Sequence, residues 1–136
     1  MNRAPGICFL LLLAAGCSLP PERVPLKPLM EDSPPQLYGE LLGRARVQAT
    51  AATESFYVNG WGDLEELAKG LEQTARFLPR ALEVPAQHKE KLPDQAADLE
   101  KECRNLREAA RTQNVKLTNE VMQRINLMVR ELRTER

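Results

Sequence analysis

From residue 36 onward, apolar side chains recur every three or four positions, as they do on the buried face of an α-helix. Turn-forming residues and prolines divide this pattern into four segments, at about residues 36–57, 63–77, 93–112 and 114–133. No segment alternates apolar and polar residues with the period of a β-strand. We therefore expect an all-α fold, and an antiparallel four-helix bundle is the simplest way to bury four such faces against one another.

Local signals predict where these helices begin and end. The pair Asn59-Gly60 can adopt positive φ and should end the first helix. Asp63, with Glu66 three residues later, has the spacing of a capping box and should begin the second. Pro79 should end or kink that helix, because it lacks a backbone N–H group, and the prolines that follow indicate a loop up to the third helix. Asn114 is a suitable cap for the fourth.

Residues on the four apolar faces should form the core. In chain order they are Leu37, Tyr38, Leu41, Leu42, Ala45, Ala49, Ala52 and Phe56; Leu64, Leu67, Ala68, Leu71, Ala75, Leu78 and Leu82; Leu92, Ala96, Leu99, Cys103, Leu106 and Ala110; and Leu117, Val121, Met122, Ile125, Met128, Val129 and Leu132. Opposite charges four residues apart should line the outer faces, each pair adding about 0.3–0.5 kcal/mol. These pairs are Glu65/Lys69, Glu100/Arg104 and Glu120/Arg124.

The residues before the helices divide into two parts. A single positive charge precedes an apolar run from Ile7 to Ala15, which is about half the length needed to span a bilayer and is typical of a secretion signal. Residues 18–35 then hold six of the ten prolines. We interpret this stretch as a flexible spacer, able to reach roughly 55 Å in polyproline II form. A ligand for a proline-binding groove is the alternative.

The apolar run ends in Leu13-Ala14-Ala15-Gly16-Cys17, which resembles the lipobox of bacterial lipoproteins. The usual leucine three places before the cysteine is Ala14 here, with Leu13 one place further out. The resemblance implies removal of residues 1–16, acylation of Cys17 with chains such as palmitate, and a mature protein anchored in the cell envelope, facing the periplasm. Ser18 in place of aspartate favours the outer membrane over the inner. The alternative is an ordinary signal cut near Ala15, with Cys17 unmodified.

The mature chain divides into the lipidated Cys17 with its proline-rich linker, residues 17–35, and the helical part, residues 36–136. Removal of residues 1–16 leaves 120 residues with a net charge of −1, enough for one modest core. This balanced charge gives no basic surface for nucleic acid, and aromatic residues make up only 4% of the chain. The composition thus argues against a nucleic-acid partner.

Three cysteines are present in the whole chain, and only Cys103 is expected to remain as a thiol. Cys8 leaves with the signal and Cys17 carries lipid, so no disulfide can form within one mature chain. Residues 63–76 match residues 98–111 at an offset of 35, with six of fourteen positions identical and Ala68 opposite Cys103. A small apolar residue at the equivalent position favours a buried structural thiol. A dimer-forming or reactive cysteine is the alternative.

No catalytic constellation is evident. His88 is the only histidine, lies in the loop before the third helix in the stretch His-Lys-Glu-Lys, whose positive charges would oppose a metal, and is expected to be solvated. One histidine and one thiol cannot make a zinc or copper site within one chain. Neighbouring carboxylates are most simply outer faces of helices; they are Glu65 with Glu66 and Glu100 with Glu102. We predict no enzymatic activity, cofactor or metal.

Two further resemblances suggest alternatives. Four amphipathic helices with a proline-containing link resemble the cytochrome c-prime architecture, which implies a haem-binding bundle. That family attaches haem through CxxCH in its last helix, where this chain has Ile125, Met128 and Val129, so covalent attachment is excluded. Met122 or Met128 could hold haem only without a histidine partner. Leu117-Thr118 resembles the first part of the LTxxQ motif of Spy-like periplasmic chaperones, and Val121 replaces its glutamine.

The sequence predicts a membrane-anchored, non-enzymatic envelope lipoprotein whose helices serve a structural or protein-interaction role. A haem-like ligand carrier and a periplasmic stress chaperone are the alternatives. The membrane, through the lipid anchor, is the one partner that the sequence indicates. The protein partner and the oligomeric state are not specified by these residues.

Overall fold

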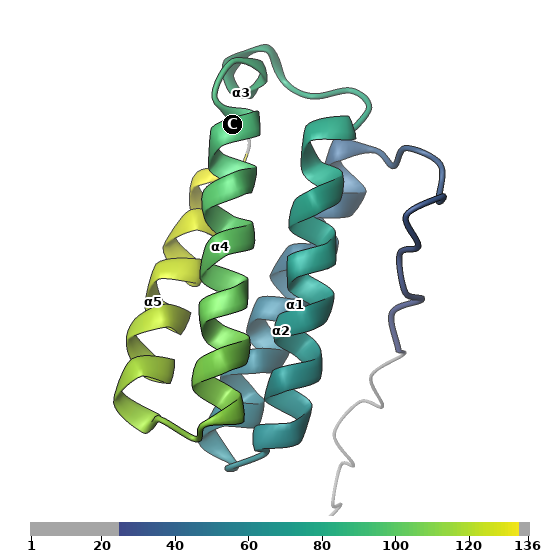
Figure 1. Ribbon diagram of the computed structural model, residues 1–136. Coiled ribbons are helices and arrows are strands. Elements are labelled where there is room, and N and C mark those ends of the chain that lie inside the picture. The colour runs from purple at the N-terminus through teal and green to yellow at the C-terminus, as the bar shows by residue number, and fades with distance from the viewer. Residues whose placement is uncertain (1–24, 134–136) are drawn as a thin grey trace, which may run out of the picture.

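Four long helices lie side by side in the computed structural model, which describes residues 25–133 (Figure 1). They are α1 (Tyr38–Tyr57), α2 (Trp61–Phe77), α4 (Leu92–Arg111) and α5 (Val115–Glu131). A 3₁₀ turn, η1 (Leu78–Arg80), and the short helix α3 (Ala86–Lys89) connect α2 to α4. The expected all-α class is confirmed. The signal, residues 1–16, and Cys17 lie outside the described residues.

The core lies between the long helices, which share it unequally. The interface of α2 with α4 is the largest, those of α1 with α2 and of α4 with α5 follow, and that of α1 with α5 is the smallest. All six positions predicted on the inner face of α4 are buried. The predicted core was wrong at Leu37, Leu82 and Leu117, which are exposed. The first two lie outside the helices, and Thr118 takes the inward position in the first turn of α5.

The helix boundaries agree with most of the local signals. Asn59 has the positive φ, 57°, that ends α1, and the Asn114 side chain accepts a 3.0 Å hydrogen bond from the backbone N–H of Leu117. Pro79 lies in η1, directly after the end of α2. The predicted capping box was wrong, because α2 begins two residues before Asp63 with no side-chain cap. Asp63 instead lies in the first turn, where its charge is favourable to the helix dipole.

One end of the helical body, which we define as residues 36–133, joins three distant segments. The Tyr38 hydroxyl donates to the carbonyl oxygen of Leu132, and the Tyr38 backbone N–H donates to that of Leu82 at 2.9 Å. His88 stacks on the Tyr38 ring at 5.8 Å, and its Nε2 lies 3.1 Å from the Arg133 carbonyl oxygen. The expectation of a solvated His88 was wrong. This residue is only 9% exposed, because α3 brings it onto a ring fifty residues earlier in the chain.

The proline-rich segment packs along the outside of α1 and α2. Figure 1 shows it leaving the start of α1 and running back beside α2. Leu29 packs against the core, and Arg44 of α1 donates a hydrogen bond to the carbonyl oxygen of Lys27. The interpretation as a flexible spacer was therefore wrong at Lys27 and Leu29, which contact α1 and the core, while most of residues 25–35 are exposed.

No helix within residues 25–133 has both the length and the apolar character that crossing a bilayer requires.

Candidate functional site

The most strongly charged cluster of the helical body surrounds Glu72 of α2, whose side chain is only 4% exposed. Arg76 Nη2 lies 2.9 Å from Glu72 Oε1, and Arg107 Nη1 of α4 lies 3.1 Å from Oε2. Arg104 Nη1 is 3.9 Å from Oε1. A buried carboxylate needs this kind of compensation, because removing its charge from water is costly.

Glu100 extends the cluster toward solvent. Its Oε1 accepts from Arg76 Nε at 2.9 Å and from Arg104 Nη1 at 2.7 Å, which confirms the predicted Glu100/Arg104 pair. The hydrogen bond from Arg76 lowers the pKa of Glu100, with the charge of Arg104 adding to the effect. The same bond raises the pKa of Arg76. This network holds α2 to α4 through opposite charges and acts as a structural element. Glu72 Oε2 takes part through its ion pair with Arg107 and has no hydrogen-bond partner among the described residues.

The role of Glu72 was missed, because a glutamate beside an apolar face is normally solvated. The internal similarity contained a usable signal. At the offset of 35, Glu72 corresponds to Arg107, so equivalent positions on the two similar helices carry opposite charges. Two helices that pack with these faces together would place those charges close to one another. Arg124 was expected to pair with Glu120 on its own helix. In the structure its Nε instead donates to Glu102 of α4 at 3.0 Å, which is again a contact between helices.

A second buried polar contact joins α1 to α2. Thr74 Oγ1 donates to Gln48 Oε1 at 2.7 Å, and both side chains are buried. A Cβ atom at Gly70 would lie 3.0 Å from Gln48 Nε2, which explains why the smallest residue is present there. The donor on α2 meets an acceptor on α1 inside the interface. Because a buried polar group without a partner is costly, this hydrogen bond favours the observed packing of α1 against α2.

Cys103 is a free thiol with no exposed surface in the middle of α4. Burial raises its pKa far above the usual value for a thiol, and the nearby carboxylate of Glu72 raises it further. Because the thiolate is the reactive form, the side chain is chemically inert in the folded protein. Ala68, its counterpart in the sister helix, is equally buried, as the internal similarity predicted.

We expect Cys103 to react with a thiol reagent at neutral pH at least ~100-fold more slowly in the native protein than in urea, since labelling requires both opening and ionisation. The measurement is the rate of mass increase with iodoacetamide in a Cys17→Ser chain without the signal. As a matched control, Val47→Cys in a Cys103→Ala background places the thiol on an exposed surface. Equal rates for the two native proteins would contradict a closed core.

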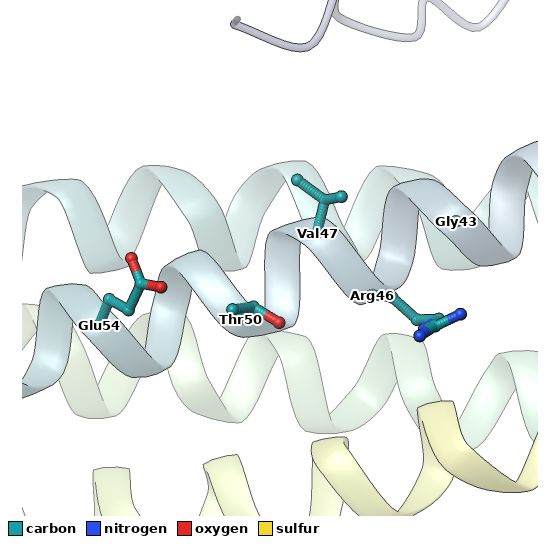
Figure 2. Close-up of a pocket in the computed structure, with 5 residues that line it drawn as sticks. All are labelled: Gly43, Arg46, Val47, Thr50 and Glu54. Atoms are coloured by element: carbon teal, nitrogen blue, oxygen red, sulfur yellow. The ribbon is translucent and has the colours of Figure 1, made fainter. Parts of the chain in front are cut away.

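Three open recesses are described on the outside of the helices, and two of them are of similar size. One, of about 590 Å³, lies between the proline-rich segment and the α1–α2 face, and its lining includes Pro25, Leu26, Arg44 and Asp63. The other, of about 580 Å³, is shallow and is lined by one helix alone. Figure 2 shows its five residues along α1, with Arg46, Val47 and Glu54 projecting outward from the helix.

The remaining candidate residues belong to the core. Ile125, Val129 and Met122 are buried and Met128 is half-buried, so the positions compared with the haem-attachment motif are packing positions. Within residues 25–133, no three histidine, cysteine or acidic side chains gather as a metal site would require. The one group with predicted chemistry, Cys17, lies outside the described residues.

Neither a family model, nor a curated protein, nor a solved structure matches this chain.

Proposed function

We propose that this chain is a cell-envelope lipoprotein, anchored through acyl chains on Cys17, with a non-catalytic helical body that serves a structural or protein-interaction role. The proposal depends on one observation: the residues from Leu13 to Cys17 end an apolar run too short to span a bilayer and supply a cysteine for acylation. Two or more acyl chains give firm anchoring where one does not. Ser18 favours the outer membrane, with the body facing the periplasm.

The helical body is, in this proposal, an antiparallel four-helix bundle. Turns of three residues, 58–60 and 112–114, join α1 to α2 and α4 to α5, which favours opposite directions for each pair. The contacts follow a ring from α1 to α2, α4, α5 and back to α1. Such a body is suited to present a fixed surface to a partner.

The interior supports an interaction module over a ligand carrier. The inner faces are filled by side chains that pack as one apolar cluster, and the recesses described above lie outside it. A haem-sized ligand would have to displace this packing, and protein interiors tolerate such changes in volume poorly. The buried polar groups at the α2–α4 and α1–α2 interfaces, Glu72 and Thr74, are paired with protein groups, which favours a structural role for them.

The test is the intact mass of the protein expressed with its own signal in a lipoprotein-competent bacterium. We expect a membrane-bound chain that begins at Cys17 and carries the mass of its acyl chains. The matched control, Cys17→Ser, should lose that mass and leave the membrane fraction. A wild-type chain with an unmodified cysteine would refute the anchor, and a coloured preparation with a Soret band would refute the proposed class in favour of a haem carrier.

A further inference from the structure

Exposed apolar side chains gather at the end of the helical body that carries its two short turns. Tyr57 and Val58, at the end of α1, are 74% and 76% exposed, and Val115, at the start of α5, is 59% exposed. Figure 1 places both turns at the same end, opposite the junction of Tyr38 with Leu132. We call the surface formed by Tyr57, Val58 and Val115 the turn-end patch. Its residues contribute little to the core, so their apolar character is unexplained by folding.

The aromatic residues strengthen this observation. Five aromatic residues lie within residues 25–133, and two of them, Tyr38 and Phe77, are buried. The other three, Phe56, Tyr57 and Trp61, lie together around the turn between α1 and α2. The Phe56 ring contacts that of Tyr57 and, edge-on, that of Trp61, each with centroids 5.8 Å apart. Tyrosine and tryptophan favour the boundary between water and lipid, because they combine an apolar ring with a polar group.

The path of the chain before α1 brings the proposed anchor near this end. The proline-rich segment runs back along α1 and α2, so that Pro25 shares the lining of the larger recess with Ser55 and Asp63, residues close to the turn. Eight peptide units separate Pro25 from Cys17, and they span at most about 29 Å when fully extended. Helix α1, at 20 residues, is itself about 30 Å long. An acylated Cys17 therefore keeps the helical body within about its own length of the bilayer.

We propose that the turn-end patch rests on the lipid bilayer, with Tyr57, Val58 and Val115 in the interfacial region and Trp61 beside them. The inference rests on the proposed anchor, because three exposed apolar residues bury too little area to hold a soluble protein on a membrane. Once acyl chains supply the attachment, the patch determines orientation. The helices then stand on the membrane, and the junction of Tyr38, His88 and Leu132 faces away from it.

Trp61 provides the probe, because it is the only tryptophan of the chain. The experiment reconstitutes the acylated full-length mature protein in phosphatidylcholine vesicles brominated at acyl positions near the headgroup, and compares its fluorescence with that in unbrominated vesicles. We expect about half of the emission to be lost, since interfacial aromatic residues lie at the headgroup level within reach of the bromines. The non-acylated Cys17→Ser chain, mixed with the same vesicles, should show no loss.

Matched variants separate the turn-end patch from the side of the body. Tyr57→Ser combined with Val58→Ser should restore most of the emission while the protein stays on the vesicles. Val47→Ser combined with Leu127→Ser changes residues that are about as exposed as Val115 but lie elsewhere on α1 and α5, and should leave quenching unchanged. All four side chains are exposed, so the variants are expected to fold, which circular dichroism checks.

Failure of this inference and failure of the anchor give different results. If the acylated protein sediments with vesicles but Trp61 keeps its full emission, the turn-end patch does not face lipid and is available to a protein partner, while the anchor stands. If both variant pairs reduce quenching equally, the body has no preferred orientation and the inference is overturned. If Cys17 carries no lipid, the proposed function fails before orientation is measured.

Discussion

Replacement of Leu99 by alanine is expected to lower the free energy of unfolding by about 2–5 kcal/mol, because it removes a buried branched side chain and leaves a cavity. Leu99 lies on the inner face of α4 with no exposed surface and belongs to the main apolar cluster. Helix α4 contacts both α2 and α5, so neighbours on two sides lose contacts. Urea unfolding followed by circular dichroism at 222 nm measures the change.

The matched control is Leu127→Ala, the same chemical change on α5 at a side chain that is 53% exposed. We expect a loss below about 1 kcal/mol there, since most of the side chain is already in water. Both substitutions replace leucine by alanine within a helix and therefore change the helix propensity by almost the same amount. The difference between their losses in the free energy of unfolding thus reports burial. Similar losses for the two variants would mean that Leu99 is not enclosed as described.

Replacement of Glu72 by glutamine is expected to cost about 2–3 kcal/mol, near the lower end of the range for breaking a buried ion pair. The substitution keeps the shape of the side chain and removes the charge that Arg76, Arg104 and Arg107 surround. These arginines keep about half of their side-chain surface in solvent, which lets water compensate part of the loss. The loss is measured by urea unfolding at neutral pH and low salt.

Glu108→Gln is the control for this prediction. Glu108 pairs with Arg111 three residues later at 2.6 Å, and both side chains are about 60% exposed. Exposed pairs contribute little to stability, because water screens the charges, so this variant should remain close to wild type. A Glu72→Gln protein within about 0.5 kcal/mol of wild type would show that the cluster is solvated in spite of its burial, and would remove the structural role assigned to it.

The sequence predicted the helices closely because two independent signals coincide there. The apolar period identifies each inner face, and Asn59, Pro79 and Asn114 interrupt it at the helix ends. Errors arose where a residue is determined by contacts far along the chain. His88 was assigned from its charged neighbours, whereas its burial depends on Tyr38. The role of Glu72 was missed because two of its three arginines come from another helix.

The proline-rich segment illustrates a different limit. Proline predicts a backbone that forms neither helix nor strand, and residues 25–31 indeed have neither. It does not predict whether that backbone packs against something, which depends here on Leu29 and on the Arg44 donor. Cys17, the candidate functional residue, shows the opposite situation, because the sequence indicates its role and the fold does not. It was identified from its sequence context alone, because lipidation depends on a short linear motif and not on the fold.

The junction between Tyr38 and Leu132 has a consequence for the order of folding. The two residues are 94 positions apart, so their contact closes nearly the whole helical body. The entropy lost in closing a chain segment rises with its length, whereas α1 with α2 and α4 with α5 can pair across turns of three residues. The helical pairs should therefore form early and the junction last. Weakening it, as by Tyr38→Phe, should speed unfolding and leave the folding rate almost unchanged.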